Sequence, residues 1–321
     1  MALLTELSLS SVKPLGKLFE LDLCEIEPLT AGSVNSNFRL TDSAGNQYFA
    51  RLYEEQDHAG AAREHALVAA LDDAGVPVVR GLRSKDGGSL ADFEGKAFAV
   101  FPWIEGEILC QARVTPAACR ALGAALARVH LCTPRAPALP AGRFRIPDLR
   151  ERLARVEAAG RASLLPAVRT IRERLEHYEA QRAQNLEQGI CHGDLFRDNV
   201  LWQGPKLRAL LDFESVCLNN FAYDLMVTTL AWCYGSEFEL GLVQALFDGY
   251  RSVRPLPAAE VAALRSEGAI ACLRFATTRL TDFSLRVPEG SPPLRQFGRF
   301  LARLAAIESG VLDGCVASLE V

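Results

Sequence analysis

Three polar residues are spaced along the middle of the chain as in enzymes that transfer phosphoryl groups. Asp194 follows a short apolar strand, Asn199 lies five residues later, and Asp212 ends a second apolar run thirteen residues beyond Asn199. In phosphoryl transfer one carboxylate orients the attacking hydroxyl, while an amide oxygen and a second carboxylate hold magnesium against ATP. Mg²⁺ prefers such oxygen ligands. We therefore predict a phosphotransferase that uses ATP and Mg²⁺, with Asp194 as catalytic base and Asn199 and Asp212 as metal ligands.

The first hundred residues supply candidates for nucleotide binding. Arg51 lies in a strand where protein kinases carry a phosphate-binding lysine, and an arginine can grip phosphate with two donors. Glu64 lies on the apolar stripe of a predicted helix, where an inward-facing carboxylate requires a cationic partner. The further candidates are Gly32, Asn35 and Asn37 in the loop between two strands, and Pro102 and Ile104 in the connector that ATP is expected to contact.

Three residues near the catalytic motif are expected to support it. We expect His192 to brace the loop by hydrogen bonds and Asp224 to tie the loop to the following helix. Glu214 is open to three interpretations, namely a second metal contact, a substrate contact or a structural role.

The N-terminal part is predicted to consist mostly of strands and turns. Two apolar runs at 36–41 and 47–53 are joined by Asp42-Ser43-Ala44-Gly45-Asn46, which is typical of a hairpin. Residues 58–74 carry helical periodicity and Gly75 follows as a stop. A further short strand is expected at 97–101.

After residue 106 the pattern is mainly helical. Thr115 followed by Pro116 is typical of a helix start, and the charged stretch 148–186 predicts long helices. Strands are expected at 189–191, 200–202 and 207–211, and the proline-rich stretch 134–147 is expected to be a loop.

These elements predict an α+β, bilobal, protein-kinase-like fold. Its small lobe, residues 1–100, carries an antiparallel sheet and binds nucleotide. Residues 101–106 form the hinge, and residues 107–321 form the larger helical lobe, which holds the catalytic hairpin and binds the acceptor.

The composition favours a small-molecule substrate. A net charge of −4 argues against nucleic acid as a partner. The nine cysteines are scattered, and their spacing indicates neither a disulfide framework nor a zinc site, so we expect a cytoplasmic protein. Neither a signal peptide nor a membrane span is expected. The oligomeric state stays open.

Several motifs together resemble the aminoglycoside-phosphotransferase-like kinases, and within them the type II homoserine kinases. They are the asparagine-rich loop 32–38, the strand 49–54, the segments 192–201 and 212–214, Tyr223-Asp224-Leu225, the stretch 249–256 and the tail from Cys272 to Asp282. The resemblance implies transfer of the γ-phosphate of ATP to the side-chain hydroxyl of L-homoserine. It assigns the same roles to Asp194, Asn199 and Asp212.

The sequence departs from this family at two places. Threonine is frequent in the family where Arg51 stands, and residues 212–217 lack the expected aromatic character. A homoserine site must also pair an ammonium and a carboxylate, because an unpaired buried charge is costly. The candidates in the sequence are Glu214, Arg274, Arg279 and Asp282.

Other functions remain open from the residues alone. The same chemistry serves kinases of aminoglycosides, choline, sugars or protein serine and threonine. A non-catalytic, nucleotide-binding pseudokinase is the alternative of a different class, and the absence of a strand lysine is its main support.

Overall fold

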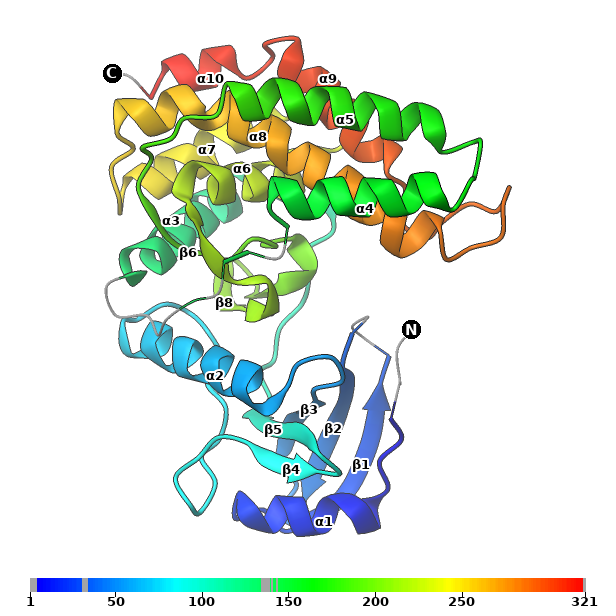
Figure 1. Ribbon diagram of the computed structural model, residues 1–321. Coiled ribbons are helices and arrows are strands. Elements are labelled where there is room, and N and C mark those ends of the chain that lie inside the picture. Colours follow the sequence, from blue (N-terminus) through cyan, green and yellow to red (C-terminus); the bar gives the residue numbers. More distant parts are fainter. Residues whose placement is uncertain (1–4, 31–33, 134–138, 140, 143, 320–321) are drawn as a thin grey trace. The chain divides into compact units, whose positions relative to one another are not determined.

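The computed structural model describes residues 5–30, 34–133, 139, 141–142 and 144–319. The chain divides into two compact units. The N-terminal unit holds the residues up to Glu107 together with Arg208–Glu214. The C-terminal unit holds the described residues between Ile108 and Leu207 and those from Ser215 onward (Figure 1).

The N-terminal unit is an antiparallel sheet with two helices. Its elements are α1 (Leu9–Leu18), β1 (Leu23–Leu29), β2 (Ser36–Asp42), β3 (Gln47–Leu52), α2 (His58–Asp73), β4 (Ala91–Phe93) and β5 (Lys96–Pro102). The five strands pair antiparallel in the order β1-β2-β3-β5-β4. The predicted antiparallel sheet is confirmed, whereas α1 and β1 were not predicted.

The hairpin between β2 and β3 shows why its turn residues are where they are. The side chain of Asp42 accepts hydrogen bonds from the backbone N–H groups of Ala44 and Asn46, at 3.0 and 2.8 Å. Gly45 adopts φ +85°, which glycine reaches without the penalty that a Cβ imposes. The turn therefore fixes the register of the two strands.

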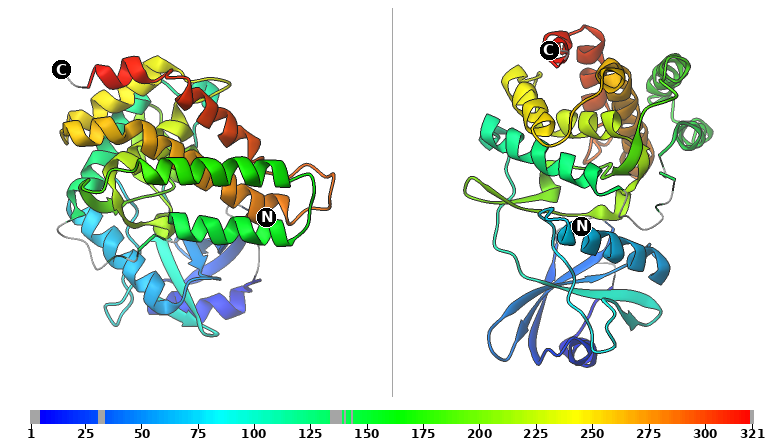
Figure 2. Two further views of the ribbon diagram at one scale, coloured as in Figure 1. Left: turned by 45° about the horizontal axis from the view of Figure 1, so that its top comes forward. Right: turned by 90° about the vertical axis from the view of Figure 1, so that its left-hand side faces the viewer.

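Alternation along β5 gives the sheet two different faces. Phe98 and Val100 join Val12 and Leu15 of α1 in one apolar core. Ala97 and Ala99 point to the other face, where they pack with Ala61 of α2. The two helices thus cover opposite faces of the sheet (Figure 2). Small side chains on the α2 face let that helix lie close to the strands.

The C-terminal unit is mainly helical. Its helices are α3 (Pro116–Leu131), α4 (Ile146–Ala158), α5 (Leu165–Ala180), α6 (Phe221–Trp232), α7 (Leu240–Arg251), α8 (Ala258–Arg279), which continues into a π-helical turn (Leu280–Ser284), α9 (Gly298–Glu308) and α10 (Asp313–Ala317). Its strands are β6 (Gln188–Cys191), β7 (Val200–Gln203) and β9 (Cys217–Asn220), and β8 (Lys206–Leu210) runs from this unit into the N-terminal one. Short 3-10 helices cover Gln111–Arg113, Arg197–Asn199 and Phe213–Ser215.

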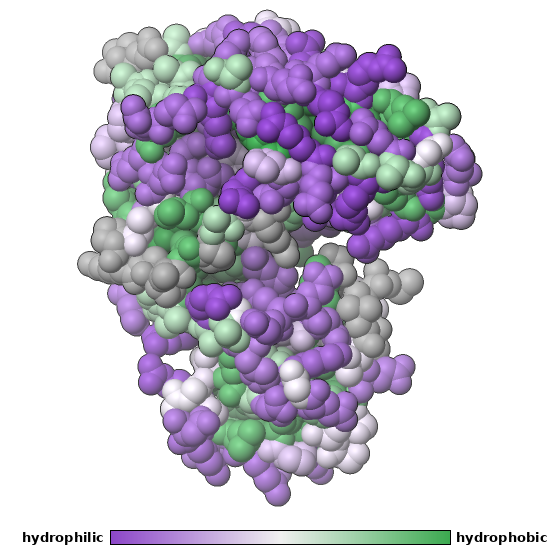
Figure 3. All heavy atoms as spheres, viewed as in Figure 1, coloured by the Kyte–Doolittle hydropathy of each residue, from purple (hydrophilic) through white to green (hydrophobic). Residues whose placement is uncertain are grey.

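Helix α8 is the centre of this unit and packs against α4, α5, α6 and α9. Helix α5 is amphipathic, since Leu175 and Tyr178 are buried while Glu173 and Glu176 are exposed. The surface over α4 and α5 is accordingly largely hydrophilic (Figure 3). The predicted start of α3 is confirmed, because the Thr115 side chain accepts a hydrogen bond from Ala118 N–H.

Helices α3 and α7 approach so closely that both carry glycine at the contact. A Cβ on Gly123 would lie 2.1 Å from the carbonyl oxygen of Leu246, and one on Gly249 would lie 2.0 Å from that of Arg120. Neither backbone can accommodate a side chain at this separation. No helix of the described residues is long and apolar enough to cross a membrane.

Candidate active site

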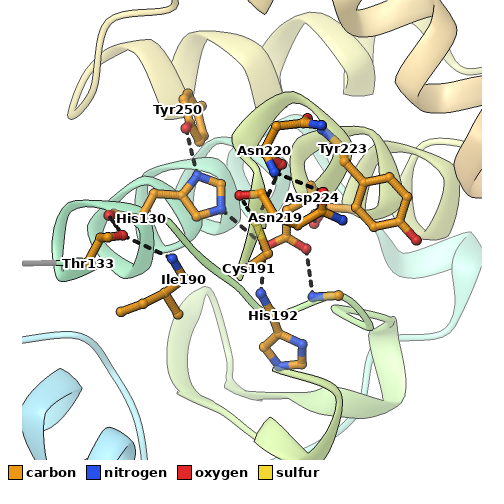
Figure 4. Close-up of polar contacts among 12 residues, drawn as sticks. His130, Thr133, Ile190, Cys191, His192, Asn219, Asn220, Tyr223, Asp224 and Tyr250 are labelled. Atoms are coloured by element: carbon orange, nitrogen blue, oxygen red, sulfur yellow. Dashed lines mark hydrogen bonds and ion pairs between the residues drawn. The ribbon is translucent and has the colours of Figure 1, made fainter. Parts of the chain in front are cut away.

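The catalytic loop begins where β6 ends and is held by one buried carboxylate. The backbone N–H groups of His192 and Gly193 each donate a hydrogen bond of 2.7 Å to Asp224, one to each carboxylate oxygen (Figure 4). Gly193 adopts φ +72°, and a Cβ there would lie 3.0 Å from the carbonyl oxygen of Ser215. The loop therefore needs glycine at this position, and the predicted tie between the loop and α6 is confirmed.

Asp224 is in turn held by a histidine. His130 of α3 lies with Nε2 3.1 Å from Asp224 and Nδ1 2.7 Å from the hydroxyl of Tyr250, and all three side chains are buried (Figure 4). Burial lowers the pKa of His130 and outweighs its carboxylate neighbour, so the ring is neutral. Burial raises the pKa of Asp224, but its hydrogen bonds with His130 and with the backbone N–H of Gly193 are among the causes that lower it overall. Because an ionised carboxylate only accepts, Nε2 must carry the proton, and Tyr250 must donate to Nδ1.

The same network continues to a buried arginine. Arg254 donates to the hydroxyl of Tyr250 at 3.2 Å and to both oxygens of Glu260 at 2.7 Å. It also lies over the ring of Phe221, with its guanidinium carbon 4.4 Å from the centroid. The chain of contacts from Arg254 to Gly193 explains how the stretch 249–256 supports the loop.

Asp194 follows directly and is partly exposed. Its backbone N–H lies 3.3 Å from Nδ1 of His192, which confirms the bracing role predicted for that histidine. Its carbonyl accepts from Phe196 N–H at 2.7 Å and from the side-chain amide of Asn199 at 2.8 Å. Its carboxylate, 31% exposed, forms an ion pair of 3.2 Å with Arg274 of α8.

The two predicted metal ligands fit a hard cation by their chemistry. The amide nitrogen of Asn199 donates to Asp194, so the amide oxygen is the atom that remains for a cation. Asp212 follows β8 at φ +61°, a conformation that is costly for a residue with a Cβ and that is found at functional sites. Asp194 and Asn199 lie together in the C-terminal unit, whereas Asp212 belongs to the N-terminal unit.

A second polar cluster lies within the N-terminal unit. Arg51 forms an ion pair of 3.5 Å with Glu214, and its Nε donates to the side-chain oxygen of Asn37 at 3.3 Å. Asn35 donates to Glu214 and accepts from the backbone N–H of Glu54 at 3.1 Å. The structure therefore brings together four residues that the sequence had singled out, and Glu214 is the carboxylate that joins them.

Arg51 and Glu64 of this cluster differ in how their charges are balanced by neighbouring groups. Burial lowers the pKa of Arg51, but Tyr53 and three nearby carboxylates raise it overall, so the guanidinium stays charged. Burial raises the pKa of Glu64 to about 8, and the charges of Glu214 and Asp212 act in the same direction. Glu64 is 8% exposed and one of its oxygens has no hydrogen-bond partner among the described residues. Arg51 forms its ion pair with Glu214, while its positive charge still lowers the pKa of Glu64 against the effect of burial. The cationic partner expected for Glu64 stays a prediction.

Of the remaining nucleotide-site candidates, two lie within the described residues and one does not. Pro102 ends β5 and Ile104 follows it, both half-buried. Gly32 lies outside the described residues.

One cluster of potential metal ligands is a hydrogen-bonding centre instead. His130, Cys191 and Asp224 place their donor atoms within 4.8 Å of one another. Both nitrogens of His130 and both oxygens of Asp224 are already bonded, and the Cys191 thiol donates to two backbone carbonyls at 3.4 Å. Burial raises the pKa of Cys191 well above its usual range, which keeps it a thiol.

A pocket of about 340 Å³ adjoins the catalytic loop inside the C-terminal unit. Gly193, Phe144 and Asn219 line it, together with Arg145, Arg182 and Arg274. No aspartate or glutamate is among its described lining residues. The charged side chains of the lining are therefore arginines, each ion-paired with a carboxylate outside the lining.

The four charges considered for an amino-acid acceptor lie in different surroundings. Arg274 lines the pocket, whereas Asp282 is paired with Arg152 at 2.8 Å. Arg279 lies over the ring of Phe300 and donates to the carbonyl of Gln296. Since Glu214 belongs to the N-terminal unit, Arg274 is the one that borders both the pocket and Asp194.

A family model for phosphotransferase enzymes matches residues 25–256, more than half of the chain. The chain belongs to the phosphotransferase enzyme family. Among curated relatives, a homoserine kinase of Methylocella silvestris is 33% identical over 271 residues, which cover 83% of each chain. A homoserine kinase of Methylobacterium radiotolerans is 34% identical over 304 residues, with 91% of each chain covered. The predictions of an ATP-dependent phosphotransferase and of its aminoglycoside-phosphotransferase-like family are confirmed.

Solved structures of low sequence identity share the fold of this phosphotransferase. An amicoumacin kinase, hAmiN, superposes with a TM-score of 0.70 at 17% identity, covering 96% of this chain and 94% of its own. A spectinomycin phosphotransferase gives 0.66 at 14% identity, covering 98% and 99%. The predicted α+β kinase-like fold is confirmed.

No sequence pattern pointed to His130, which supports the loop from α3. Nothing in its neighbourhood distinguishes it from a core histidine, and its role depends on Tyr250 and Asp224, which are distant in sequence. Tyr250 lies in a stretch that the family resemblance included, although its function was not inferred.

Proposed function

We propose that this phosphotransferase transfers the γ-phosphoryl group of ATP to the side-chain hydroxyl of L-homoserine, with Mg²⁺ as the metal. The pocket beside the catalytic loop is the observation that favours this acceptor. Its charged lining side chains are arginines, without a described carboxylate. Such a lining offers arginine donors to the anionic group of an acceptor and, among its described residues, no carboxylate to a polycationic aminoglycoside or to choline. The names of the curated relatives support the same acceptor.

Asp194 acts as the catalytic base. Its carboxylate accepts the proton of the acceptor hydroxyl as that oxygen bonds to the γ-phosphorus and the bond from phosphorus to the ADP oxygen breaks. Its backbone is fixed by Asn199 and His192, so the carboxylate is oriented before the acceptor binds. General-base catalysis of this kind contributes about 10²- to 10⁴-fold in rate.

Asn199 and Asp212 would hold the metal, through an amide oxygen and a carboxylate respectively. Mg²⁺ bound there would neutralise charge on the phosphates of ATP. Arg51, oriented by Asn37 and Glu214, is the nearby cation for the nucleotide. Gly32, Asn35, Glu64, Pro102 and Ile104 complete the proposed nucleotide site.

The test is ADP release with Mg-ATP across a panel of acceptors. The panel holds L-homoserine, choline, an aminoglycoside, a sugar alcohol and a generic protein substrate. We expect turnover with L-homoserine and its loss, by about 10²-fold or more, in Asp194→Asn. Turnover with a different member of the panel would refute the acceptor and retain the phosphotransferase. ATP binding without turnover on any acceptor would favour the pseudokinase.

A further inference from the structure

We infer that Arg274 recognises the carboxylate of the acceptor, and that it does so by giving up its ion pair with Asp194. The inference rests on the proposed function and assigns one residue within it. Arg274 would thereby select amino-acid acceptors and also leave the base free only when such an acceptor is bound.

The surroundings of Arg274 hold its guanidinium in place. Its side chain is 4% exposed, and its guanidinium carbon lies 4.2 Å from the ring centroid of Phe144 and 3.8 Å from that of Phe275. Contacts on two aromatic rings restrict the plane of the group without using its N–H donors. The arginine is therefore fixed in orientation and still able to bind.

The hydrogen bonding of Arg274 is incomplete for a buried arginine. Of its five N–H donors, the structure pairs one, with Asp194 at 3.2 Å, and its Nε has no partner among the described residues. Two other arginines of the same unit differ. Arg254 binds both oxygens of Glu260, and Arg182 binds both oxygens of Glu267, at 2.8 and 2.9 Å. A buried cation with donors to spare at the edge of a pocket indicates a missing anionic ligand.

Arg274 lies where the carboxylate of an amino-acid acceptor would be when the hydroxyl of that acceptor reaches Asp194. It lines the pocket, as Gly193 and Phe144 do, and it contacts Asp194 directly. In L-homoserine the hydroxyl lies on the third carbon from the carboxylate. One arginine beside the base can therefore hold the carboxylate while the hydroxyl reaches that base. A planar carboxylate can also take two parallel donors from a guanidinium, which makes it a stronger partner than the single contact with Asp194.

The exchange of partners has a consequence for the base. While Asp194 is paired with Arg274, the guanidinium occupies Oδ1 of its carboxylate at 3.2 Å, so that oxygen is not available to the acceptor hydroxyl. When the acceptor carboxylate takes over the guanidinium, Asp194 is released next to the hydroxyl. An acceptor without a carboxylate lacks the group that releases it.

The experiment compares two acceptors that differ in one group. 3-Amino-1-propanol has the ammonium and hydroxyl of homoserine but no carboxylate. We expect Arg274→Gln to lower kcat/KM for L-homoserine about 10- to 100-fold more than kcat/KM for 3-amino-1-propanol. Arg274→Lys, which keeps the charge but not the paired donors, should lie between the wild type and Arg274→Gln. It also serves if Arg274→Gln fails to fold.

Arg265→Gln is the matched control, because it removes the same charge from the same helix. Arg265 is exposed and binds the carbonyl of Glu308, away from the pocket lining. Its ratio of the two kcat/KM values should equal that of the wild type. Equal losses on both acceptors in Arg274→Gln and Arg274→Lys would overturn the inference and leave homoserine as the acceptor. Wild-type protein that phosphorylates another acceptor and not homoserine would overturn the proposed function, and this inference with it.

Discussion

The buried carboxylate of Glu64 predicts a stability change that depends on pH in a defined direction. Burial raises its pKa from 4.5 to about 8. The folded state therefore binds this proton more tightly than the unfolded chain does. The resulting stabilisation is fully present below pH 4.5 and is lost as the pH rises to about 8. Glu64→Gln replaces the carboxyl group by a neutral group of the same shape. The variant should therefore keep this stabilisation as the pH rises.

The magnitude follows from the two pKa values. Each pH unit between them is worth about 1.4 kcal/mol. The free energy of unfolding of Glu64→Gln should thus equal that of the wild type near pH 4.5. It should exceed the wild-type value by about 3 kcal/mol at pH 7 and by something on the order of 5 kcal/mol above pH 8.

Urea unfolding at pH 5, 6, 7 and 8 without added divalent metal measures this difference. Intrinsic fluorescence can follow it, because Trp103 lies in the N-terminal unit with Glu64. Asp42→Asn is the control, because its difference from the wild type should stay constant from pH 5 to pH 8. Hydrogen bonds from Asn46, Tyr48 and Ala44 lower the pKa of Asp42, so its contribution is present above pH 4 and lost in acid. A difference between Glu64→Gln and wild type that stays constant from pH 5 to pH 8 would refute the reasoning.

Two further substitutions test how the C-terminal unit positions its loop and its helices. Asp224→Asn would present an NH₂ group to one of the two backbone N–H groups that now donate hydrogen bonds to Asp224. We expect the free energy of unfolding in urea to fall by about 3 kcal/mol, and kcat to fall at unchanged ATP affinity. An unchanged kcat would show that Asp194 does not depend on this carboxylate. Gly123→Ala should destabilise the protein by about 1 to 3 kcal/mol, because its Cβ would lie 2.1 Å from a carbonyl of α7. Gly241→Ala at the start of α7, where a Cβ meets nothing within 4 Å, should leave the melting temperature equal or higher, and similar losses in both variants would argue against the close contact.

Local patterns predicted the elements that depend on local interactions. The hairpin at Asp42–Asn46 and the start of α3 at Thr115 are decided by side chains that bond their own backbone within four residues. Helix α1 escaped prediction because its stability comes from packing on the sheet, where Val12 and Leu15 enter the core, and because Pro14 lies inside it. Strand β9 is only four residues long and is defined by its pairing with β6.

The candidate site was predictable where residue type and spacing carry the chemistry. Asp194, Asn199 and Asp212 were found in this way, and their roles stay predictions. The surroundings of Arg51 and Glu64 were not predictable, because they depend on where the carboxylates of the segment after β8 lie in space. The structure pairs Arg51 with Glu214, 163 residues away, and leaves Glu64 without an ion pair among the described residues.

This redistribution of charge bears on the metal. The guanidinium of Arg51 is paired with Glu214, and Glu64, with a pKa of about 8, is largely protonated at neutral pH. Asp212 is then the carboxylate of this cluster that has no hydrogen bond or ion pair of its own among the described residues, and it is held at φ +61°. A carboxylate without a hydrogen bond or ion pair, on a backbone at positive φ, contributes little to stability and is suited to bind a divalent cation. The replacement of a lysine by Arg51 therefore fits a metal-binding role for Asp212, because Glu214 satisfies the arginine and leaves that carboxylate available.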